Sequence, residues 1–155
     1  AGTRKDSIRA VQLIFKYIRT AYNDGNDMRA RKQMLYAAYL AGSAFTKSYV
    51  GYVHAVAHSL GGRYNTPHGL AICAGLADAG TPDDEGAAIF IEAIRQMKED
   101  LNIPDVIPEI KEEDIPELAR FADKEANPLY PVPKLMNASE LEKFYYCVMS
   151  LGQAD

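Results

Sequence analysis

Apolar residues recur along this chain three or four positions apart, and strict alternation of apolar with polar residues is almost absent. A recurrence near 3.6 residues places apolar side chains on one face of a helix, whereas a half-buried strand needs a period of two. The pattern therefore predicts an all-α fold. The first helix should bury a stripe that consists of Ile8, Val11, Phe15, Ile18 and Tyr22.

Capping residues and breaks divide the rest of the chain into further helices. Asp27 is placed to cap the second helix, and Asn137 with Glu140 has the spacing of a capping box. The segment from Asn127 to Pro133 is too rich in proline for a helix. We expect helices over residues 6 or 7 to 22, 27 to 47, a segment through His54 and His58 that ends at Leu60, 67 to 79, 82 to 101, 114 to 126, and 137 to 151.

Three of these helices carry more specific expectations. In the second helix, small residues should let a neighbouring helix pack closely, with Phe45 filling the remaining space. Thr81 and Pro82 should start the fifth helix. Asp114 and Glu117 should form a capping box at the start of the sixth helix. The small residues are Ala37, Ala38, Ala41, Gly42 and Ala44, and the inward residues of the sixth helix should be Leu118, Phe121 and Ala122.

All three histidines of the chain lie within fifteen residues of each other. His54 and His58 are four residues apart, so they project from one face of a helix. Gly61-Gly62 should end that helix, because glycine readily takes the left-handed conformation of a C-cap. Thr66 to Gly69 then resembles the start of the next helix. This tight turn is expected to bring His68 back against His54.

The clustering of imidazoles favours a metal site or a catalytic site. Imidazole is the commonest protein ligand for transition metals, and a metal that polarises a substrate needs about three protein ligands and an open position. Spacing alone would allow all three histidines to bind one metal. The alternative is a set of hydrogen-bonded core histidines, and the spacing does not exclude it.

Composition and charge narrow the possible partners. The 155 residues carry 17 basic and 21 acidic side chains, and the net charge of -4 opposes non-specific binding to nucleic acid or an anionic membrane. The sequence lacks a secretory signal and a run of about 18 apolar residues, so we expect no membrane span and a cytoplasmic location. Cys73 and Cys147 should be free thiols. Without a linker or a repeat, residues 1–155 are expected to form a single domain.

Three segments together resemble the iron-dependent alcohol dehydrogenases, which are related in architecture to glycerol dehydrogenase and dehydroquinate synthase. The segment GYVHAVAHSLGGRYNTPHGLA resembles the signature of that family. ARKQMLYAAYLAGSAF resembles the helix before the signature, and EDIPELARFADKEANPLYPVP resembles the C-terminal region. The whole chain is thus similar to the helical C-terminal half of these enzymes, and the N-terminal nucleotide-binding half has no counterpart in it.

The resemblance implies a two-domain oxidoreductase that interconverts a small alcohol and an aldehyde, with a leaning towards primary alcohols. Its N-terminal domain would bind NAD or NADP, and the helical domain would hold Fe(II), sometimes replaced by Zn. His54 and His68 match the metal-binding histidines of the family signature. His58 matches a histidine that is not a ligand but lies beside the nicotinamide and the substrate, where it can relay the hydroxyl proton. A homo-oligomer is compatible with the resemblance, and the oligomeric state is left open.

Two departures from the family pattern limit this expectation. The other two metal ligands of the family are an Asp and a His four residues apart, and no D-x-x-x-H occurs in this sequence. A stretch of a few tens of residues after Ala71 is also missing. We therefore expect weak metal retention and no dehydrogenase activity from the isolated chain. A zinc enzyme similar to dehydroquinate synthase or glycerol dehydrogenase, and a non-catalytic helical interaction domain, are the alternatives.

Overall fold

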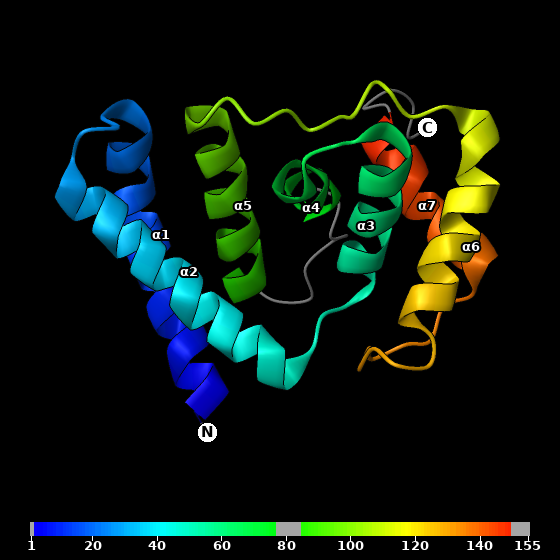
Figure 1. Cartoon of the computed structure of the whole chain (residues 1–155), viewed down its shortest axis with the longest axis horizontal. Coiled ribbons are helices and arrows are strands. Elements are labelled where there is room, and N and C mark those ends of the chain that lie inside the picture. The colour runs from blue at the N-terminus through cyan, green and yellow to red at the C-terminus, as the bar shows by residue number, and fades with distance from the viewer. Residues whose placement is uncertain (1, 77–84, 150–155) are drawn as a thin grey trace. The chain divides into compact units, whose positions relative to one another are not determined.

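The computed structural model describes residues 2–76 and 85–149, and every regular element in these ranges is a helix. This confirms the predicted all-α fold. None of the helices in the described ranges is long and apolar enough to cross a membrane. The elements are α1 (Gly2–Asn23), α2 (Met28–Ser48), α3 (Tyr52–Tyr64), α4 (His68–Leu76), α5 (Glu85–Asp100), the 3-10 helix η1 (Glu112–Asp114), α6 (Ile115–Ala126) and α7 (Ala138–Met149) (Figure 1).

The chain divides into two compact units, Ala1–Tyr49 and Val50–Asp155. The single domain expected from the sequence stays a prediction. The predicted start of the fifth helix at Thr81 and Pro82, the end of the fourth at residue 79 and the end of the last at residue 151 lie outside the described residues.

The first unit is a hairpin in which α1 and α2 lie side by side (Figure 1). Asp27 caps α2 as predicted, and its carboxylate accepts a hydrogen bond of 2.8 Å from the backbone N–H of Ala30. The small residue Ala37 is fully buried between the two helices, while Ala38 and Phe45 are exposed. The core of the hairpin consists of Ala10, Leu13, Ala37 and Leu40.

The prediction of which face of α1 is buried is wrong. Ile8 and Tyr22 are about half exposed, and Val11 is also exposed. The buried face instead centres on Ala10 and Leu13. Apolar residues follow helical spacing on two faces of α1, so the spacing alone could not decide which of the two faces is buried. The close approach of α2 at Ala37 selects the face that carries the small residue.

The second unit is organised around α3, which packs against α4, α6 and α7. Its core includes Leu60, Ile115 and Leu141, all completely buried. Tyr145 of α7 is also fully buried, and its hydroxyl lies 2.7 Å from Ser59 Oγ and donates to the carbonyl oxygen of Leu118 at 3.0 Å. Burial raises the pKa of Tyr145 to about 12, so the hydroxyl keeps its proton and ties three helices together.

The later loops and caps are largely as the sequence predicts. Asn137 and Glu140 form the expected capping box, with two reciprocal hydrogen bonds of 3.0 Å at the start of α7. The proline-rich segment is not helical. It is held to α3 by Tyr52, whose hydroxyl donates to Asn127 Oδ1 at 2.8 Å. One prediction for α6 is wrong, because Phe121 is 57% exposed although Leu118 and Ala122 point inward.

The turn between α3 and α4 lies later in the chain than the sequence suggested. Gly61 and Gly62 do not end α3, which continues to Tyr64, and Asn65 is the residue in the left-handed conformation, with φ 54°. The turn needs only one such residue, and asparagine adopts this conformation more readily than most side chains. His68 then begins α4 after Pro67.

This position of the turn predicts opposite effects for two alanine substitutions. No heavy atom lies within 4 Å of a Cβ added at Gly62, so Gly62→Ala should raise the free energy of unfolding by about 0.5–1 kcal/mol, as for a glycine in a helix interior. Asn65→Ala should lower it by about 1 kcal/mol, because alanine disfavours the left-handed region. Urea denaturation measures both changes, and destabilisation by Gly62→Ala would contradict the observed helix end.

Candidate functional site

The three histidine rings gather where α3 meets the start of α4. His54 and His58 come from successive turns of α3, and His68 is the first residue of α4. The ring centres of His54 and His68 are 5.4 Å apart, those of His58 and His68 4.9 Å, and those of His54 and His58 6.1 Å. The structure therefore brings together all three residues that the sequence singled out.

The inclinations of the rings distinguish the His54–His68 pair from the His58–His68 pair. A metal ion binds in the plane of an imidazole, and two rings that share a tetrahedral ion at about 2.1 Å have centres roughly 5 Å apart. The planes of His54 and His68 are inclined by 57°, which lets two in-plane nitrogens converge on one point. The ring of His58 is stacked on that of His68 at 23°, and nearly parallel planes do not converge in this way.

The pair of His54 and His68 therefore fits a metal ion as two imidazole ligands. Within residues 2–76 and 85–149, no group of three or more His, Cys, Asp or Glu side chains is arranged to hold a metal ion. An ion that acts on a substrate needs about three protein ligands. Two imidazoles would thus be fewer ligands than such an ion needs.

The electrostatic environment favours the neutral form of His54. Burial is the largest cause that lowers its pKa, followed by the neighbouring His68 and His58, while Glu125 opposes the shift. Desolvation disfavours a charged imidazole, and two imidazolium ions at this distance repel each other. A metal ion requires neutral imidazole ligands, and the lowered pKa of His54 is compatible with that requirement.

His58 makes a polar contact with a carboxylate of α6. Its Nδ1 lies 2.6 Å from Oε1 of Glu125, and the hydroxyl of Tyr130 donates to the same oxygen at 2.5 Å. Burial and Glu125 raise the pKa of Tyr130 to about 12, which keeps this hydroxyl protonated. Sequence reasoning missed Glu125. The available signal was its position in the last turn of α6, where the helix dipole disfavours a negative charge.

A second network fixes the end of α3 immediately before the turn. Asp114 accepts hydrogen bonds from Arg63 Nη2 at 2.5 Å, Arg63 Nε at 3.2 Å and the Tyr64 hydroxyl at 2.6 Å. The predicted capping box is wrong, because the Asp114 side chain makes no capping bond to α6. Its carboxylate instead binds two residues that come directly before Asn65, and so it holds the turn in place.

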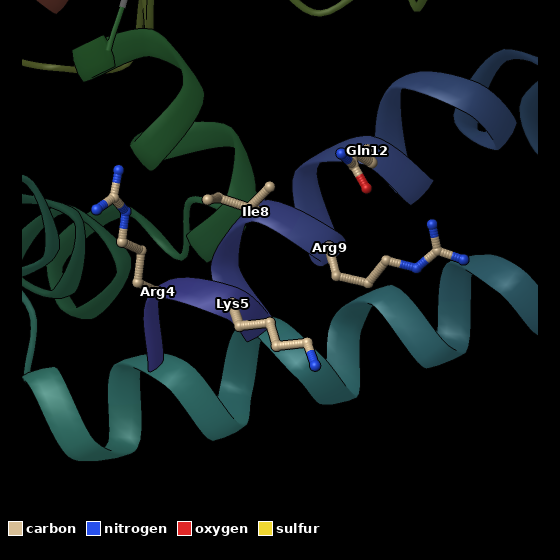
Figure 2. Close-up of a pocket in the computed structure, with 5 residues that line it drawn as sticks. All are labelled: Arg4, Lys5, Ile8, Arg9 and Gln12. Atoms are coloured by element: carbon tan, nitrogen blue, oxygen red, sulfur yellow. The ribbon is translucent and has the colours of Figure 1, made fainter. Parts of the chain in front are cut away.

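A pocket in the first unit has a mainly cationic lining, unlike the histidine cluster. It has a volume of about 520 Å³ and is lined by three cationic side chains, an aliphatic one and an amide, all from α1 (Figure 2). It contains none of the three histidines and no carboxylate. The lining residues are Arg4, Lys5, Ile8, Arg9 and Gln12.

Comparison with known proteins shows which family the chain resembles. The model of the C-terminal part of the Fe-containing alcohol dehydrogenase family matches residues 5–79, which include all three histidines. The chain is 32% identical to 1,3-propanediol dehydrogenase of Citrobacter freundii, over 90% of this chain and 42% of that protein. The crystal structure of a 1,3-propanediol oxidoreductase superposes with a TM-score of 0.81 at 31% identity, over 93% of this chain and 44% of that one.

The chain belongs to the iron-containing alcohol dehydrogenase family. It corresponds to the helical C-terminal part of these proteins, as the sequence predicts, and spans less than half the length of the relatives it matches. The alignment with the Citrobacter protein has 165 positions, more than the 155 residues of this chain, so the relative has residues with no counterpart here. The same fold occurs in sulfoacetaldehyde reductase from Bifidobacterium kashiwanohense in complex with NAD+, with a TM-score of 0.78 at 23% identity, over 98% of this chain and 45% of that one.

The Asp114 network predicts a specific dependence of stability on pH. Hydrogen bonds from Arg63 and Tyr64 lower the pKa of Asp114. The ionised carboxylate therefore stabilises the fold above the ordinary Asp pKa of about 3.9, and this contribution is lost as the pH falls through the lowered pKa of the folded state.

Asp114→Asn should reduce the free energy of unfolding at pH 7 and flatten its decline in acid, because the amide has no charge to lose. Denaturant unfolding between pH 2 and pH 7 measures this effect. Glu113→Gln is the matched control, since Glu113 is an exposed neighbour. An acid profile of Asp114→Asn that coincides with that of the original protein would refute the assignment.

Proposed function

We propose that this chain is the metal-binding part of an NAD(P)-dependent alcohol dehydrogenase, in which His54 and His68 are ligands of Fe(II) or of Zn in its place. The observation that carries the proposal is the separation of 5.4 Å between the two inclined rings. Membership of the iron-containing alcohol dehydrogenase family supports it. The lowered pKa of His54 also supports it, because a ligand must be neutral.

The proposed reaction interconverts a primary alcohol and an aldehyde. When bound, the metal ion would supply Lewis-acid polarisation of the alcohol oxygen. The nicotinamide cofactor would accept the hydride, and the protein would orient the two reactants. Relatives named for 1,3-propanediol support a small primary alcohol as the substrate class.

In this proposal His58 is the residue of the chain that receives the hydroxyl proton and lies beside the nicotinamide. Its ring stacks on that of His68, which argues against a shared metal ion, and one of its nitrogens is already bound to Glu125. An imidazole with one nitrogen held and the other available can act as a general base. His58 therefore has a role separate from the two proposed ligands.

Two imidazoles alone make a weak site. Because an ion with an open position needs about three protein ligands, we expect these residues alone to retain metal weakly and to catalyse no dehydrogenation. In the complete enzyme, further ligands and the binding of NAD or NADP would come from a part that this sequence does not contain. The cytoplasmic location stays a prediction.

Metal titration of the histidine variants tests the proposal. Zn2+ is a suitable probe because it is stable in air, and calorimetry gives its affinity. His54→Ala and His68→Ala should each weaken Zn2+ binding by more than about tenfold, since even partners of metal ligands contribute that much.

His58→Ala is the control for this titration and should leave the Zn2+ affinity unchanged. Unchanged affinity in His54→Ala and His68→Ala would contradict the proposal and would favour a non-catalytic helical interaction domain. A loss of affinity in His58→Ala as large as in the other two variants would assign all three rings to the metal.

A further inference from the structure

A carboxylate from another helix holds the ring of His58. Glu125 lies in the last turn of α6, 67 positions further along the chain, and its Oε1 is 2.6 Å from Nδ1 of His58. We propose that Glu125 is a positioning residue that keeps the proton of neutral His58 on Nδ1 and leaves Nε2 as the proton acceptor. The role of this tautomer in catalysis rests on the proposed function. The assignment of the tautomer itself rests only on the contact between His58 and Glu125.

The chemistry of the contact selects one tautomer. An ionised carboxylate can only accept hydrogen bonds, so a neutral imidazole at this distance must donate the hydrogen on Nδ1. The other nitrogen, Nε2, then carries a lone pair. The Tyr130 hydroxyl donates to the same carboxylate oxygen, so this oxygen is fixed from two sides.

A second contact fixes the plane of the ring. The ring of His58 stacks on that of His68 with centres 4.9 Å apart and planes 23° from parallel. The hydrogen bond to Glu125 determines which edge of the ring faces α6, and the stacking limits its rotation. Together they set the direction of Nε2 before any substrate is present, which is the preorganisation that proton transfer requires.

The contact between Glu125 and His58 should contribute little to the stability of the fold. The side chains of His58 and Glu125 are 44% and 35% exposed, and ion pairs with this exposure contribute little to stability. A negative charge in the last turn of a helix is also opposed by the helix dipole. Replacing Glu125 should therefore affect the histidine more than the fold.

Imidazole nitrogen spectroscopy tests the tautomer directly. Long-range 1H–15N NMR spectra of the metal-free protein at about pH 9, well above the ordinary imidazole pKa of about 6.5, distinguish a proton on Nδ1 from one on Nε2. His58 should carry the proton on Nδ1 in the original protein. Glu125→Ala should shift it towards Nε2, the form that free histidine prefers.

Two variants control this measurement. Glu125→Gln keeps an acceptor oxygen, which Tyr130 can still hold, so the Nδ1 proton should be retained. Glu117→Ala removes an exposed carboxylate from the first turn of the same helix and should change nothing. A proton on Nε2 of His58 in the original protein, or the same tautomer in Glu125→Ala, would overturn the proposal.

Kinetics of the enzyme with its nucleotide-binding part separate positioning from a structural role. Glu125→Ala should lower kcat by about tenfold to a hundredfold, the range found when the carboxylate partner of a metal-bound histidine is lost, with little change in KM. Metal content should stay the same, and Glu125→Gln should recover most of the rate. Loss of metal together with activity would overturn the positioning role. If the metal proposal fails, the Zn2+ titrations of His54→Ala and His68→Ala will show it. The tautomer of His58 would be unaffected by that outcome.

Discussion

The turn between α3 and α4 is the constraint on which the site depends. Asn65 reverses the chain in a left-handed conformation, and the reversal places His68 5.4 Å from His54. Asp114 secures the turn by binding Arg63 and Tyr64, the two residues before it. The approach of the two rings thus follows from backbone geometry that a packed helical unit supports.

The three clustered rings differ in their contacts and inclinations. His54 and His68 are inclined so that their nitrogens can converge, while His58 is stacked on His68 and bound to Glu125. Two histidines four residues apart on a helix could equally have shared one ligand. The contact from α6 makes the difference, because it occupies one nitrogen of His58 and directs the other. Residues more than sixty positions apart therefore define one site.

The sequence predicted the helices and the gathering of the histidines well, because helical period, capping residues and a rare motif are local signals. The predictions failed where contacts between residues far apart in the sequence determine the structure. The buried face of α1 depends on the approach of α2 at Ala37, and apolar residues on two faces of α1 hid that choice. Asp114 had the spacing of a cap but binds Arg63 instead. Glu125 carried no motif, and only the packing of α6 on α3 shows its partner.

Crystals of the protein soaked with Zn2+ and measured at the zinc absorption edge would show where the ion binds. One anomalous peak should lie within bonding distance of a single ring nitrogen of His54 and of His68, with the Nδ1 of His58 still on Glu125. A peak bonded to His58, or zinc sites only outside this turn, would contradict the proposal that His54 and His68 are the metal ligands.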